Sequence, residues 1–167
     1  MPFIQEQFFD IGANLTHQSF TEDLDSVLTE ANKLGVKRLS VTGSSVKDSL
    51  EAFEITQRYP KTCISTAGIH PHNAREYSSA SFSEIKDLLK NDLVKSIGET
   101  GLDFNRNFSS PEDQQKSFEA HLELSIELNK PLFLHERDAH EKFVEITSLY
   151  LKDLPKSVVH CFTGSEE

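Results

Sequence analysis

The sequence VKSIGETGLD, residues 94–103, joins a short strand-like run to a polar cluster without a break. The run from Val94 to Gly98 is predicted to be one strand of a parallel sheet that is covered on both faces. A carboxylate at the mouth of such a sheet is costly unless it is paired or bound to a metal ion. Glu99 is therefore the first candidate for a functional residue.

Five further runs are predicted to be strands, and helical patterns lie between them. A strand and a helix together recur about every thirty residues, which is the size of a βα unit. The clearest helices are predicted from Leu24 to Leu34, from Val46 to Tyr59 and from a cap at Ser110 onward. The other predicted strands are Phe8 to Ala13, Arg38 to Thr42, Cys63 to Ile69, Pro131 to Leu134 and Val158 to Phe162. This alternation indicates an α/β fold.

Polar clusters follow nearly every predicted strand, as on the catalytic face of a barrel. The clusters are Asp10 to Asn14, His70 to His72, Glu99 to Asp103, His135 to Asp138 and His160-Cys161. An open doubly wound sheet is the alternative, but no glycine-rich phosphate loop follows the first strand. We therefore expect a TIM-type (β/α)8 barrel.

The 167 residues are fewer than the ~250 of a typical complete barrel. Thr163 to Glu167 has the composition of a helix start. We expect residues 1–167 to form the N-terminal two-thirds of a single barrel domain, with about six βα units.

The overall charge limits the functions that the chain can have. Its net charge of −10 excludes a broad basic surface for gripping duplex DNA, so metal ions and a few arginines must supply local positive charge. Neither a signal peptide nor a run long enough to cross a bilayer is visible. With Cys63 and Cys161 as expected free thiols, we expect a cytoplasmic protein without a membrane partner.

Three histidines, His70, His135 and His160, stand where predicted strands end, which suits metal binding because ligands must converge from several directions. Taken singly, each of the last two is equally compatible with a buried histidine bonded to backbone. The remaining histidines, expected in a loop, on the surface or in helix packing, are His72, His17, His121 and His140. Arg106 and Arg137 are either phosphate clamps or ion-pair partners of Asp103 and Asp138.

Five motifs together resemble one family. GETGLDF at residues 98–104 resembles the G-E-x-G-L-D-[FY] signature of TatD-family nucleases. The same order of motifs continues with TAGIHPH at 66–72, the pair His135 and Arg137, and HCFTG at 160–164. At the first strand, Gly12 and Asn14 replace the His-x-His of many relatives, which resembles the D-x-G-x-N subgroup.

The resemblance implies a barrel of the metal-dependent hydrolase superfamily that cleaves DNA, with RNA as a further substrate. It implies Glu99, His135 and His160 as metal ligands, and His70 and Arg137 as catalytic residues in the same pocket. The expected substrate-binding residues are Asp10, Asn14, His72, Asp103 and Arg106. The aspartate that the family carries on its last strand is not among these 167 residues.

The expected activity is hydrolysis of a terminal phosphodiester by metal-activated water, as in a 3′–5′ exonuclease on single-stranded DNA. The family favours Mg²⁺, whereas mixed histidine and glutamate ligands also suit Mn²⁺ or Zn²⁺. The full-length protein is expected to be a monomer. Two alternatives remain open: a metal-dependent hydrolase of a small amide, ester or lactone, and a non-catalytic fragment.

Overall fold

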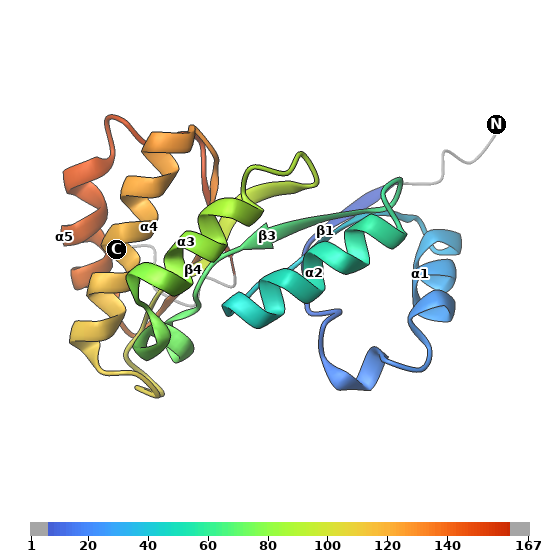
Figure 1. Cartoon of the computed structure of the whole chain (residues 1–167), viewed down its shortest axis with the longest axis horizontal. Helices are drawn as coiled ribbons and strands as arrows, with labels where there is room; N and C mark the ends of the chain where they lie inside the picture. Colours follow the sequence, from blue (N-terminus) through green and yellow to red (C-terminus); the bar gives the residue numbers. More distant parts are fainter. Residues whose placement is uncertain (1–6, 161–167) are drawn as a thin grey trace.

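The computed structural model describes residues 7–160, which form one parallel sheet with helices between its strands (Figure 1). The strands are β1 Phe8–Ala13, β2 Val36–Val41, β3 Cys63–Ala67, β4 Val94–Asp103, β5 Leu132–Arg137 and β6 Val158–His160. The α-helices are α1 Leu24–Lys33, α2 Val46–Arg58, α3 Ser79–Leu88, α4 Pro111–Leu128 and α5 His140–Tyr150. Two short 3₁₀ helices, η1 Gln18–Phe20 and η2 Pro71–Glu76, lie after β1 and β3.

The strands follow one another in sequence order, from β1 at one edge to β6 at the other, and every neighbouring pair is parallel. The sheet curls into part of a barrel. This confirms the predicted α/β fold with six strands of a TIM-type barrel. The carboxyl ends of all its strands therefore open toward one face, where the polar clusters of the sequence lie.

Two strands, β4 and β5, extend further at their carboxyl ends than the sequence predicts, whereas β2 begins two residues earlier and β3 ends two residues earlier. β4 continues through Glu99 to Asp103, and β5 continues to Arg137, because the two strands pair along these polar residues up to the partners Asp103 and Arg137. Gly101 makes this pairing possible. Its φ is 140°, and a Cβ there would lie 1.9 Å from the carbonyl oxygen of His135.

α4 begins at its predicted cap, and α1 and α2 begin at the predicted residues Leu24 and Val46. The Ser45 and Ser110 side chains accept hydrogen bonds from the amides of Asp48 and Asp113, at the starts of α2 and α4. α1 and α2 each end one residue earlier than predicted. The last two residues of the strand predicted at Val158 to Phe162, and the helix predicted after Thr163, lie outside the described residues.

Two groups of apolar side chains form the interior. The larger joins β3, β4 and β5 to α3, α4 and α5, and the smaller joins β1 and β2 to α1 and α2. Cys63 lies in the smaller group as a free thiol, and burial raises its pKa to about 11. Within residues 7–160, no helix is long and apolar enough to cross a membrane.

The two edge strands carry exposed apolar side chains. Phe8, Phe9 and Ile11 of β1 are 52%, 50% and 41% exposed, and Val158 and Val159 of β6 are 41% and 38% exposed. Phe9, Ile11 and Val158 also line an apolar hollow of about 310 Å³ together with residues of the strands between them. The edge strands and this hollow together expose apolar surface on the sheet.

Candidate metal centre

Four side chains from neighbouring parts of the sheet meet at its carboxyl end. Glu99 belongs to β4, His135 to β5 and His160 to β6, while His70 directly precedes η2 in the connection that follows β3. The register places His135 beside Gly101 on one side and beside His160 on the other. Neighbouring parallel strands therefore bring together residues that are far apart in the sequence.

A single oxygen of Glu99 is the centre of the group. Its Oε1 lies 2.7 Å from His160 Nε2, 3.0 Å from His135 Nδ1 and 3.4 Å from His70 Nε2. The ligand atoms of His70, Glu99 and His135 all lie within 4.8 Å of one another. The predicted metal-ligand positions thus converge, and His70, predicted as catalytic, lies among them.

The carboxylate and the imidazoles change each other's protonation. Burial would raise the pKa of Glu99, but hydrogen bonds from His135, His160 and His70 outweigh it and hold that pKa far below its usual value. Burial lowers the pKa of His70. Burial also acts to lower the pKa of His135, but the hydrogen bond to Glu99 and the nearby carboxylates raise it overall.

This donor set fits a divalent metal ion. A buried carboxylate and several imidazoles facing one point are the ligands that Zn²⁺, Mn²⁺ and related ions use. Glu99 is 9% exposed, so it is removed from bulk water yet close to the surface. Within the described part of the chain, no other three or more histidine, cysteine or acidic side chains have ligand atoms this close together.

A cavity of about 460 Å³ opens over this group. Its lining includes Asn14 and His72, two of the predicted substrate-binding residues, and also Glu99, His70 and His160. The lining also includes Gly12, which belongs to the motif of the first strand. The sequence did not reveal the remaining lining residues, Thr42, Ser44, Asn73 and Phe108, which lie in the connections after β2, β3 and β4.

The remaining predicted residues are not among those that line this cavity. Asp10 is exposed, and its Oδ1 accepts a hydrogen bond of 3.0 Å from the Gly12 amide. Arg106 is also exposed and reaches Asp103 through its backbone amide, at 3.0 Å. Arg137 is half-buried at the end of β5. Its predicted role as a phosphate clamp stays a prediction.

The acids that the sequence offered as ion-pair partners of these arginines have other contacts. Asp103 is 1% exposed and lies 2.7 Å from His72 Nε2, while Asp138 accepts a 2.6 Å hydrogen bond from the Asn105 side chain. Within residues 7–160, neither acid forms a salt bridge with Arg106 or Arg137.

Gly12 leaves room for an aromatic ring beside the centre. A Cβ at this position would lie 2.9 Å from Cζ of Phe133. The Phe133 ring in turn stacks on His160, with ring centroids 4.3 Å apart and planes 21° from parallel. The space that a side chain at position 12 would need is therefore filled by a residue that supports His160.

His121 and Gln114 have roles that the sequence showed only in part. Both are fully buried on α4, in the helix-packing position expected for His121. The His121 Nε2 accepts a hydrogen bond of 3.1 Å from the Ile69 amide, next to His70, and Nδ1 lies 2.6 Å from the Ser117 carbonyl oxygen. Burial lowers the pKa of His121 to about 4. Gln114 lies four residues before Phe118 on the same face of the helix, and this spacing is the sequence signal for its burial.

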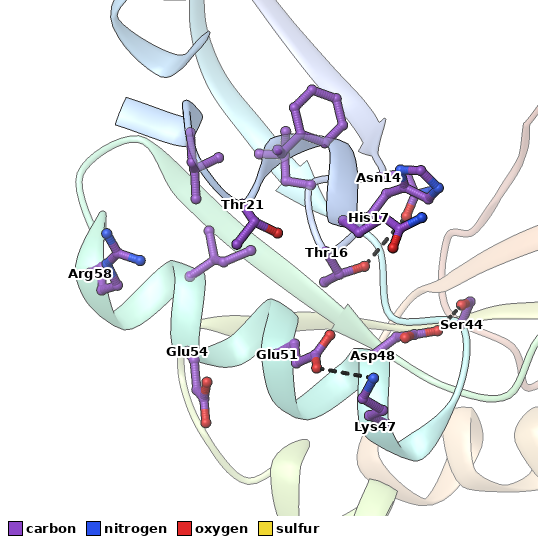
Figure 2. A pocket seen from close by; sticks show the side chains of 15 residues that line it. Asn14, Thr16, His17, Thr21, Ser44, Lys47, Asp48, Glu51, Glu54 and Arg58 are labelled. Atoms are coloured by element: carbon purple, nitrogen blue, oxygen red, sulfur yellow. Dashed lines mark hydrogen bonds and ion pairs between the residues drawn. The ribbon is translucent and has the colours of Figure 1, made fainter. Parts of the chain in front are cut away.

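A second hollow of about 590 Å³ adjoins the first and shares Asn14 and Ser44 with it. Figure 2 shows its two walls: Asn14, Thr16 and His17 come from the loop after β1, and the facing side chains come from α2. On α2, Lys47 pairs with Glu51 at 3.5 Å, and Asp48 accepts a hydrogen bond from Ser44. Glu54 and Arg58 complete this charged wall.

Curated relatives with similar sequences have a named activity. The 3′-5′ ssDNA/RNA exonuclease TatD of Escherichia fergusonii is 46% identical over 159 residues, which cover 95% of this chain and 61% of that protein. The protein of the same name from Salmonella typhimurium is also 46% identical, with the same coverage. The chain thus spans about 61% of the length of these relatives.

Solved structures agree in fold. A TatD-family hydrolase from Entamoeba histolytica has a TM-score of 0.88 at 30% identity, over 96% of this chain and 60% of its own. An uncharacterised amidohydrolase from Saccharomyces cerevisiae has a TM-score of 0.86 at 29% identity, over 96% and 63%. The sequence model of the family described as TatD related DNase matches residues 9–167. By this match and by its relatives, the chain belongs to the TatD-related DNase family.

Proposed function

We propose that this chain forms the metal-binding part of a phosphodiesterase that removes nucleotides from the 3′ end of single-stranded DNA, with RNA as a further substrate. The observation that carries the proposal is the convergence of three imidazoles on Oε1 of Glu99. Support comes from the family and from the exonuclease names of the curated relatives.

Glu99, His135 and His160 would hold the divalent ion, with His70 beside them. The bound ion supplies a more acidic water and polarises a phosphoryl oxygen. We assign Mg²⁺ as the working ion from the resemblance to the family, with Mn²⁺ and Zn²⁺ as ions that the donor set also accepts.

The chain's own residues would bind and orient the substrate. Asn14 and Ser44 carry polar groups at the junction of the two hollows, and His72 lines the cavity over Glu99. His70 Nδ1 accepts a hydrogen bond of 3.1 Å from the His72 amide, so its Nε2–H group faces Glu99 at 3.4 Å and is proposed to help position the substrate. Arg137 is proposed to neutralise phosphate charge.

The paired hollows favour a polymeric substrate over a small one. The cavity over Glu99 has a volume of about 460 Å³, and the adjoining hollow adds about 590 Å³. A terminal nucleotide over the metal centre therefore has space beside it for the chain that follows. The three acids of the second hollow outnumber its two basic residues, Lys47 and Arg58, which disfavours tight contact with a phosphate backbone and suits an enzyme acting on single-strand ends.

The test begins with metal binding, because this needs only the residues described. Isothermal titration of the 167-residue chain with Mn²⁺ should show one site, and Glu99→Gln should abolish it while preserving side-chain volume. Glu54→Gln is the matched control, since Glu54 lines the second hollow. Unchanged Mn²⁺ binding in Glu99→Gln would show that Glu99 is not a metal ligand.

Activity is tested in a chimera that joins these 167 residues to the part of the Salmonella typhimurium relative outside the 61% that they cover. With Mg²⁺, it should shorten 5′-labelled single-stranded DNA stepwise, and Glu99→Gln should reduce the rate at least 100-fold, the scale of losing a metal ligand. Cleavage inside a circular single strand would contradict the exonuclease assignment.

A second candidate is hydrolysis of a small amide, ester or lactone. The similarity to the Saccharomyces cerevisiae protein described as an amidohydrolase favours it. The same chimera should then hydrolyse small amide or lactone substrates with a Glu99 requirement and leave labelled DNA intact. Activity on DNA alone would exclude this candidate.

A further inference from the structure

We propose that Asp103 is a positioning residue of the metal centre: its buried carboxylate fixes the orientation of His135 and His72. The inference rests on the proposed function only in taking His135 as a metal ligand. Asp103 was predicted to bind substrate. With 1% exposure and both oxygens occupied, it lies behind the histidines instead.

The two oxygens of Asp103 have separate partners. Oδ1 accepts hydrogen bonds from the backbone amides of Asn105 and Arg106, both at 3.0 Å. Oδ2 is left for the imidazoles and lies 2.7 Å from His72 Nε2 and 3.4 Å from His135 Nε2. The carboxylate is thus held from one side and turned toward the histidines on the other.

A buried glutamine fixes the backbone that carries this carboxylate. Gln114 Oε1 accepts from the Asp103 amide at 2.8 Å, and its Nε2 donates to the carbonyl oxygens of Asp103 and Ser109, each at 3.0 Å. Ser109 Oγ in turn donates to the carbonyl oxygen of His72 at 3.0 Å. One network therefore holds both the carboxylate and the backbone of a histidine that it contacts.

The chemistry of the imidazole explains what this arrangement does. Nε2 of His135 is buried and has no hydrogen-bond partner among the described residues, and Oδ2 of Asp103 lies 3.4 Å from it. In the metal-free chain, Nδ1 of His135 donates to the Glu99 carboxylate at 3.0 Å. If Nδ1 gives its lone pair to a bound ion instead, the proton of the neutral ring belongs on Nε2, where the Asp103 carboxylate can accept it and hold the ring in place.

Asp103→Asn tests this role with little change in volume. The amide oxygen still accepts from Asn105 and Arg106, but an N–H group now faces the imidazoles. Because ligand-orienting carboxylates change metal affinity about 10- to 100-fold, we expect the Mn²⁺ affinity of the chain to fall by that factor. ¹⁵N–¹H spectra of the Zn²⁺-loaded chain should show the Nε2–H proton of His135 losing the downfield shift of a hydrogen-bonded proton in this variant.

Asp138→Asn is the matched control. Asp138 secures the same loop by accepting a 2.6 Å hydrogen bond from Asn105 Nδ2, and its φ of 52° suits asparagine. We expect its Mn²⁺ affinity to stay within twofold of the parent and the Nε2–H signal of His135 in the Zn²⁺-loaded chain to be unchanged. A loss in both variants would show that loop order alone sets the affinity, and would overturn the proposal.

The unsubstituted chain supplies a test that does not depend on a variant folding. If its Zn²⁺-loaded form shows no hydrogen-bonded proton on Nε2 of His135, Asp103 does not hold that ring and the proposal is wrong. Unchanged Mn²⁺ affinity in a folded Asp103→Asn variant refutes the proposal alone. Absence of Mn²⁺ binding by the parent chain refutes the metal centre itself, and with it both the proposed function and this role.

Discussion

At the scale of single residues, the strand ends made the centre predictable. Glu99, His135 and His160 follow apolar runs, and parallel strands place such residues at one face, where the structure brings them together around Glu99 Oε1. Their roles as ligands stay predictions. The sequence could not reveal Gln114 as the clamp of Asp103, because an amide on a buried helical stripe acquires its partner only when α4 packs on β4.

His121 makes stability depend on pH. Burial lowers its pKa to about 4 from 6.5, so between these values the unfolded chain takes up a proton that the folded chain does not. Its contribution is complete above pH 6.5 and declines as the pH falls toward 4. From the size of this shift, we expect a loss of about 3 kcal/mol in the free energy of unfolding.

The measurement is urea unfolding at several pH values between 7 and 4, compared with His121→Gln. Glutamine offers one donor for the Ser117 carbonyl oxygen and one acceptor for the Ile69 amide, but it does not titrate. The pH dependence in this window should therefore be shallower in the variant. Equal slopes would show that His121 is not the titrating group.

At the scale of elements, apolar runs located the strands, while polar residues obscured where two of them end. β4 and β5 extend to Asp103 and Arg137 because each supplies the other's backbone partners, a pairing that the hydrophobic pattern of one strand does not contain. The helix starts were better predicted. Ser45 and Ser110 cap through contacts within four residues, so local sequence is sufficient there.

The cap of α4 can be tested in isolation. Ser110 accepts a 3.1 Å hydrogen bond from the Asp113 amide, so Ser110→Ala should lower the free energy of unfolding by about 1 kcal/mol. Ser110→Gly should cost only a few tenths of a kcal/mol, because glycine leaves this amide open to water. Denaturant titration of the two variants measures the difference, and equal losses would contradict the capping role.

At the scale of the whole molecule, the sheet runs from β1 to β6, and within residues 7–160 the outer edges of these two strands have no partner. Such edges expose backbone donors and acceptors, and here apolar side chains lie beside them. We expect the purified 167-residue chain to associate as its concentration rises, which light scattering measures.

A lysine on one edge should weaken this association. Ile11 of β1 is 41% exposed, and Ile11→Lys places a charge on the open surface. The control is Leu149→Lys, where the side chain is 79% exposed on α5 and not on an edge strand. A parent chain that stays monomeric at every concentration, or equal effects of the two lysines, would show that the edges are not involved.

The charges around the second hollow have a consequence for the effect of salt. Proteins that bind a phosphate backbone with basic residues lose affinity as salt is added. Here Asp48, Glu51 and Glu54 outnumber Lys47 and Arg58 in the hollow that adjoins the cavity over Glu99, on a chain of net charge −10. Added salt screens their repulsion of an approaching polyanion and equally screens their attraction for a divalent cation. Moderate salt should therefore speed the encounter with a nucleic acid while weakening capture of the metal.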